Sequence, residues 1–107
     1  MKHVKVLATV AVLTFVLAAG QAMAHTPLCN CFDNGDGTVT CEGGFSDGSS
    51  AAGVSMTILD AGGAEKMKGT MDANSQYTFK KPEGKYTVRF FAGEGHEVLV
   101  PSDKIVQ

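Results

Sequence analysis

The residues of this chain that could hold a metal ion or form a covalent link lie close together in the sequence. A histidine, His25, directly follows the tripeptide AMA at positions 22–24, and Cys29, Cys31 and Cys41 lie within thirteen positions of one another. Imidazole binds nickel, copper and zinc alike, whereas thiolates bind softer cations or pair into disulfides. The spacing therefore predicts metal binding, a disulfide, or both.

The first 24 residues have the pattern of a secretory signal peptide. Lys2 and Lys5 provide a positive start, VLATVAVLTFVLAAG is an apolar core, and AMA supplies the small residues of a cleavage site. The apolar run is too short to favour a membrane anchor. We expect export, cleavage between Ala24 and His25, and a periplasmic or secreted product. No second apolar run follows, so we expect no membrane insertion of the mature chain.

Cleavage would give His25 a free α-amino group. The amine and Nδ1 of the ring could then chelate a metal ion, and the amide nitrogen of Thr26 could join them, whereas Pro27 has no N–H and ends the series. His96 follows Gly-Glu-Gly at 93–95 and could supply a second imidazole, because glycine lets the backbone bend and expose the ring. The alternative for His25 is that it is simply the first residue of the product and has no role. The alternative for His96 is that it is an ordinary exposed loop histidine.

The three cysteines allow two kinds of chemistry. If DNGDG at 33–37 is a hairpin loop, Cys29 lies opposite Cys41 and shares a face with Cys31. Opposed Cα atoms lie roughly 4.5 to 5.5 Å apart, which suits a disulfide, so Cys29–Cys41 is the simplest pairing and Cys31–Cys41 a diagonal alternative. Because His25 lies four residues before Cys29, three sulfurs and an imidazole could instead form a tetrahedral zinc or copper(I) site.

Short strands must position these residues. Apolar and polar residues alternate in VSMTILD, QYTFKK and KYTVRFFA, and glycine-rich and aspartate-rich turns separate these segments. Asp47, Asp60 and Asp72 lie beside such turns, where we expect them to cap the backbone. The pattern predicts one all-β domain at 25–107, an antiparallel two-sheet sandwich of about seven strands. The expected strands are 28–32, 38–45, 54–59, 65–71, 76–80, 85–92 and 96–100. The expected core is Val54, Met56, Ile58, Tyr77, Phe79, Tyr86, Val88, Phe90, Val98 and Val100.

Charge and size narrow the function classes. Removing Lys2 and Lys5 from the nine basic residues leaves seven against eleven acidic ones, a formal charge of about −4 on the predicted 83-residue product. This charge argues against nucleic acid as a partner. No pair of carboxylates can be placed in a cleft, and His25 near Cys29 is the one candidate base beside a cysteine, so we do not expect an enzyme. Met67 and Met71 could offer thioethers to copper(I), although methionines in a small sandwich more often fill the core.

The segment from His25 to His96 resembles a known family, the small exported component of nickel and cobalt uptake systems of the energy-coupling-factor type (NikL/CbiL-like proteins). These belong to the carboxypeptidase-regulatory-like, transthyretin-like sandwiches. The resemblance implies that His25 and His96 are ligands of nickel or cobalt and that the partner is a membrane transporter subunit. It rests on Phe45-Ser46-Asp47-Gly48, Gly53, Asp60 with Gly63, Gly69 with Asp72, Phe79 with Pro82, and Gly93-Glu94-Gly95-His96.

Three functions therefore remain open at the level of sequence. The first is a periplasmic accessory that presents nickel or cobalt through His25 and His96. The second is a periplasmic copper-binding protein that uses the same histidines or the cysteines. The third is a metal-free interaction module, which would dock through an exposed edge strand.

Overall fold

The computed structural model describes residues 25–107, so the predicted signal peptide at 1–24 lies outside the described residues. The chain forms seven strands and one short 3₁₀ helix, and every predicted strand is confirmed to within one residue at each end. The strands are β1 (Pro27–Asp33), β2 (Thr38–Phe45), β3 (Ser55–Asp60), β4 (Glu65–Thr70), β5 (Gln76–Lys80), β6 (Tyr86–Phe91) and β7 (Glu97–Pro101).

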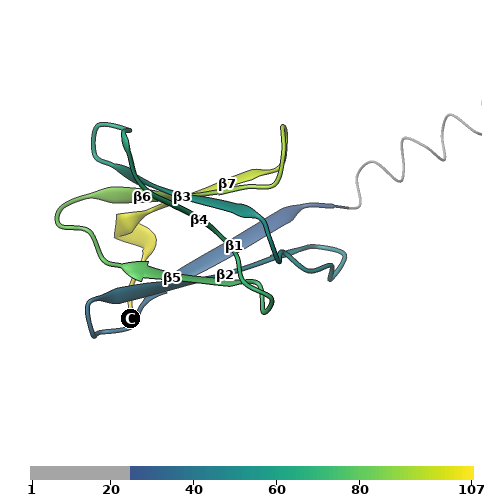
Figure 1. Cartoon of the computed structure of the whole chain (residues 1–107), viewed down its shortest axis with the longest axis horizontal. Coiled ribbons are helices and arrows are strands. Elements are labelled where there is room, and N and C mark those ends of the chain that lie inside the picture. The colour runs from purple at the N-terminus through teal and green to yellow at the C-terminus, as the bar shows by residue number, and fades with distance from the viewer. Residues whose placement is uncertain (1–24) are drawn as a thin grey trace, which may run out of the picture.

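The strands form two antiparallel sheets packed face to face, which confirms the predicted all-β sandwich (Figure 1). One sheet has the order β1-β2-β5 and the other the order β4-β3-β6-β7. β1 and β7 are edge strands of different sheets and contact each other, so they close one side of the sandwich. Within residues 25–107, no helix has the length and apolar character needed to cross a membrane.

The register of the β1–β2 hairpin differs from the prediction by two residues. Phe32 pairs with Thr40, not with Thr38, because the strands continue further into the DNGDG segment than expected. Asn34 N–H donates to the carbonyl of Thr38 at 3.0 Å, which leaves only residues 35–37 as the loop. Gly35 and Gly37 both adopt positive φ angles, 80° and 91°, and glycine adopts such angles without steric cost.

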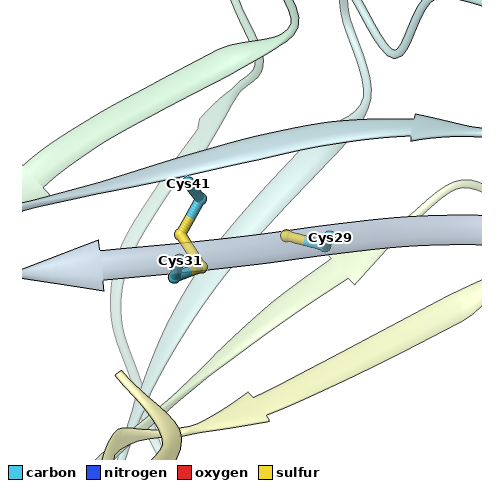
Figure 2. A group of neighbouring side chains, drawn as sticks. All are labelled: Cys29, Cys31 and Cys41. Carbon is cyan, nitrogen blue, oxygen red and sulfur yellow. A yellow bond between two sulfur atoms is a disulfide. The ribbon is translucent and has the colours of Figure 1, made fainter. Parts of the chain in front are cut away.

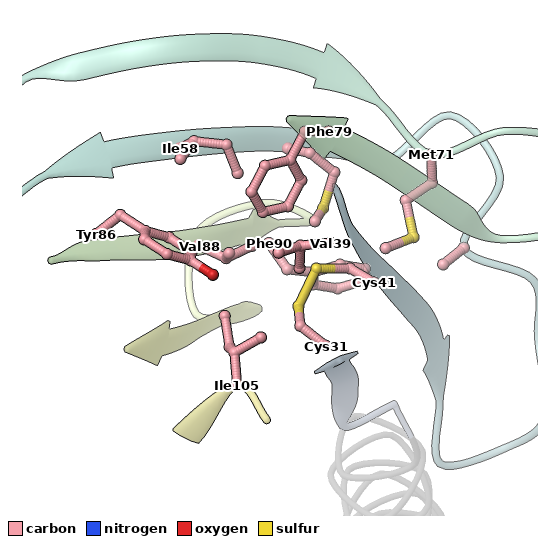
Figure 3. Packing of buried hydrophobic residues seen from close by; sticks show 12 residues of the cluster. Cys31, Val39, Cys41, Ile58, Met71, Phe79, Tyr86, Val88, Phe90 and Ile105 are labelled. Carbon is pink, nitrogen blue, oxygen red and sulfur yellow. A yellow bond between two sulfur atoms is a disulfide. The ribbon is translucent and has the colours of Figure 1, made fainter. Parts of the chain in front are cut away.

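The core lies between the two sheets and is built from alternate residues of the strands (Figure 3). Six of the ten predicted core residues are buried, and the other four (Val54, Tyr77, Val98 and Val100) are partly buried and pack against them. The prediction omitted Cys31, Val39, Cys41, Ala51, Met71 and Ile105, which are also buried.

The segment after β7 folds back onto the start of the domain. A 3₁₀ helix, Ser102–Lys104, follows Pro101, and Ile105 then inserts into the core with only 7% of its surface exposed. The carbonyl of Val106 accepts a hydrogen bond from the N–H of Asp33 at 3.0 Å, which occupies part of the free edge of β1. The end of the chain therefore belongs to the sandwich.

Gly43 provides a test of this packing. A Cβ atom at position 43 would lie 2.6 Å from Sδ of Met71 and 2.7 Å from the ring of Phe90, so alanine there forces a buried side chain to move. We expect Gly43→Ala to lower the free energy of unfolding by about 1 to 3 kcal/mol, measured by urea denaturation. Gly44→Ala is the matched control, because a Cβ at that position meets nothing closer than 4.0 Å. Equal stability of the two variants would contradict the packing described.

Candidate functional site

The β1–β2 register continues beyond the strands and positions His25. Pro27 pairs with Phe45, and the next pair outward is joined by two hydrogen bonds. Thr26 N–H donates to Oγ of Ser46, and Ser46 N–H donates to the carbonyl of Thr26, both at 2.9 Å. One step further, the same register places His25 opposite Asp47.

His25 and Asp47 contact each other directly. Nδ1 of His25 lies 2.6 Å from Oδ2 of Asp47. The other carboxylate oxygen, Oδ1, accepts hydrogen bonds from the backbone N–H of Ser49 at 3.0 Å and from its hydroxyl at 2.6 Å. These bonds from Ser49 lower the pKa of Asp47, and the His25 charge adds to the effect. The turn-capping role predicted for Asp47 is confirmed, but the contact with His25 was not predicted.

That contact was missed because of the register error. With the predicted pairing, extended outward in the same way, His25 would have faced Phe45. The observed register, shifted by two residues, brings Asp47 opposite His25 instead. A three-residue loop would have given the observed pair, but the sequence DNGDG is compatible with loops of both three and five residues.

His96 lies in the tight turn between β6 and β7. Its backbone N–H donates to the carbonyl of Gly93, and its carbonyl accepts from the N–H of Ala92, both at 2.9 Å. Nδ1 lies 3.1 Å from the carbonyl oxygen of Glu94. A carbonyl oxygen can only accept, so Nδ1 is the donor in this contact and Nε2 is the nitrogen left for another partner.

The two histidines lie at the same end of the sandwich. The start of β1 pairs with Phe45, whose ring lies 6.0 Å from that of Phe90 near the end of β6. The turn that carries His96 begins just beyond Phe91. Each imidazole has a partner of its own in this structure, and joint binding of one ion by His25 and His96 stays a prediction.

The cysteines form one disulfide and leave one free thiol (Figure 2). Cys31 and Cys41 lie directly opposite each other and are bonded, with Cα atoms 4.0 Å apart, whereas Cys29 lies opposite Gly43 and is free. The preferred pairing Cys29–Cys41 was therefore wrong, and the alternative Cys31–Cys41 is correct. The two-residue shift of the hairpin register is the reason.

All three sulfur atoms nevertheless lie within 4.8 Å of one another, on the inner face of the hairpin. His25 is not part of this group, so the predicted set of three sulfurs and an imidazole does not assemble in the described residues. Cys29 is partly buried against the core, and this burial raises the pKa of its thiol to about 11. The thiol is consequently protonated at neutral pH and is a weak nucleophile.

A cavity of about 490 Å³ lies at the opposite end of the sandwich, lined among others by Asp60, Asp103, Lys81 and Tyr86. Two of these polar groups are already engaged. Lys81 donates to Asp33 at 2.7 Å, and Oδ1 of Asp60 accepts from two backbone N–H groups of its own turn. The expected absence of enzymatic activity stays a prediction.

Comparison with known proteins adds no assignment, because no family model, curated protein or solved structure matches the chain.

The Cys29 thiol can be tested by its rate of alkylation. Its pKa is raised from 9.0 to about 11 by burial, so at pH 8 the folded chain should hold about a hundredfold less thiolate than the unfolded chain. We expect iodoacetamide, followed by intact-mass analysis, to modify Cys29 correspondingly more slowly in the folded protein, with the rate rising up to about pH 11. Cys29→Ser gives the background rate. Equal rates in buffer and in denaturant would contradict the burial.

Proposed function

We propose that the exported chain binds one nickel or cobalt ion at His25 and passes it to a membrane transporter subunit. The observation that carries this proposal is the contact between Nδ1 of His25 and Oδ2 of Asp47 at 2.6 Å. After cleavage, the α-amine and the imidazole of His25 would form a chelate, and Asp47 would add an oxygen ligand on the side of Nδ1.

The spacing of the two side chains suits such a site. Metal bonds of about 2.1 Å place neighbouring nitrogen and oxygen ligands about 3 Å apart around an octahedral or square-planar ion. The imidazole and the carboxylate therefore need to separate only slightly to admit an ion. Asp47 is held by Ser49 through its other oxygen, so the carboxylate is already oriented and ionised when the ion arrives.

The position of the site suits transfer to a partner. The side chain of His25 is 57% exposed and that of Asp47 29% exposed, so a second protein could reach the ion without unfolding the sandwich. His96, at the same end, offers Nε2 as a further ligand. A site of mixed nitrogen and oxygen ligands is compatible with nickel and cobalt, among other divalent ions. We choose nickel and cobalt because the sequence resembles exported components of nickel and cobalt uptake systems.

Metal binding by the cleaved chain tests the proposal. We expect a chain that begins at His25 to bind one nickel or cobalt ion, measured by isothermal titration calorimetry and elemental analysis. His25→Ala should abolish binding, and Asp47→Asn should weaken it by at least about tenfold. Addition of one residue before His25 should also weaken binding, because it removes the free amine from the chelate.

Asp72→Asn is the matched control for Asp47→Asn. Asp72 caps a turn in the same way, since its Oδ1 accepts from the N–H groups of Asn74 and Gln76, but no histidine contacts it in the described residues. Its substitution should leave nickel affinity unchanged. If the chain that begins at His25 binds neither ion, or if Asp47→Asn and Asp72→Asn behave alike, the proposed site is wrong.

A further inference from the structure

The three sulfur atoms on the inner face of the β1–β2 hairpin take no part in the function proposed for His25. We propose that they form a second, redox-controlled site, which binds one copper(I) ion when the Cys31–Cys41 disulfide is reduced. The site is closed while the disulfide is present, because only Cys29 then keeps a sulfur that can bind a metal.

The positions of the sulfurs fit a single ion. Thiolates bound to a metal at about 2.3 Å lie about 4 Å apart in trigonal or tetrahedral geometry. The sulfurs of Cys29, Cys31 and Cys41 all lie within 4.8 Å of one another. Once the S–S bond is broken, Cys31 and Cys41 must move apart and Cys29 slightly closer, and side-chain rotation can supply both movements without a change of backbone.

The register of the hairpin keeps the sulfurs together after reduction. Cys29 and Cys31 are two residues apart on β1 and therefore point to the same face, and Cys41 lies directly across from Cys31. β2 is the central strand of its sheet, paired with β5 on its other side, and Cys41 is fully buried. Ladders on both sides thus hold the backbone at Cys41, and the β1–β2 ladder holds Cys29 and Cys31 beside it, so the site does not depend on the disulfide alone.

The chemistry of the donors favours copper(I). Soft sulfur ligands select copper(I), zinc or iron–sulfur clusters, and zinc at a structural site takes four ligands. The group has three sulfurs and includes no histidine or carboxylate.

A further soft donor lies next to the group. A Cβ at Gly43, the residue opposite Cys29, would lie 2.6 Å from Sδ of Met71, so the thioether of Met71 lies over the same part of the hairpin. Figure 3 shows Met71 in the same buried cluster as Cys31 and Cys41. A thioether is neutral, so it adds a soft contact without adding charge.

The opening step is a balanced thiol–disulfide exchange. An external dithiol attacks the Cys31–Cys41 bond through its thiolate, a mixed disulfide forms, and the second thiol of the reductant releases the protein. Two electrons and two protons pass to the protein, and the reductant leaves as a disulfide. Copper(I) then displaces one proton from each sulfur that becomes a ligand. Exchange with an external disulfide, which takes up the two electrons and leaves as two thiols, re-forms the Cys31–Cys41 bond and releases the ion.

Anaerobic titration of the exported chain with copper(I) tests this site. The probe is copper(I) alone, held by bathocuproine disulfonate as a competing chelator, after reduction with a dithiol that is removed by gel filtration. We expect one ion per reduced chain and an ultraviolet thiolate-to-copper absorption band. The copper(I) affinity of Cys29→Ser should be at least about tenfold weaker, because loss of a group that only supports a ligand already costs about tenfold in metal affinity. The oxidised chain should lack the band.

Two controls separate this site from the one at His25. Cys29→Ser keeps the Cys31–Cys41 disulfide, so its oxidised form should fold and should bind nickel as the unmodified chain does. His25→Ala should lose nickel but keep copper(I) in the reduced form. Circular dichroism of the reduced chain, with and without copper(I), reports whether the sandwich persists.

Three results would overturn the inference. The first is equal copper(I) affinity of the reduced Cys29→Ser variant and the unmodified chain, and the second is an equal thiolate band in the oxidised chain. The third is a reduced chain that unfolds and does not refold when copper(I) is added. Loss of nickel binding alone leaves these expectations unchanged, because the two sites share no residue.

Discussion

The antiparallel pairing of β1 with β2 is the constraint on which both candidate sites depend. In the observed register Cys31 lies opposite Cys41, and this pair forms the disulfide. The same register leaves Cys29 opposite Gly43 and, continued outward through Thr26 and Ser46, brings His25 to Asp47. A register shift of one residue would turn the inward-facing side chains of one strand to the outer face. A shift of two residues would keep the faces but give every residue a different partner.

The loop that joins the two strands sets this register. Asp33 accepts a hydrogen bond from the N–H of Gly35, and Asp36 accepts one from the N–H of Thr38, so each carboxylate stabilises one side of a three-residue loop. Asp33 also pairs with Lys81, and the hydrogen bonds from Lys81 and Gly35 lower the pKa of its carboxyl group. The length of this loop therefore determines which residue lies opposite His25 at the other end of the hairpin.

The sandwich separates two kinds of potential ligand. The nitrogen and oxygen donors of His25 and Asp47 lie at one end, partly exposed to solvent. The sulfur donors lie against the core, where water is largely excluded and the protonated thiol is favoured. A domain of this size buries a modest fraction of its surface, so a disulfide inside the core also contributes to stability. The metal binding proposed for Cys31 and Cys41 would therefore require the same sulfur atoms that form the disulfide.

The sequence by itself determined the strands, because the alternation of apolar and polar residues and the turn-forming glycines and aspartates are local properties of the chain. It also determined that Cys29 and Cys31 share a face, since residues two apart on a strand always do. Only the tertiary structure decided which cysteines pair, that Asp47 meets His25, and that Ile105 enters the core. These depend on the length of one loop and on strand order, and a difference of two loop residues leaves the alternation unchanged while it exchanges every partner across the hairpin.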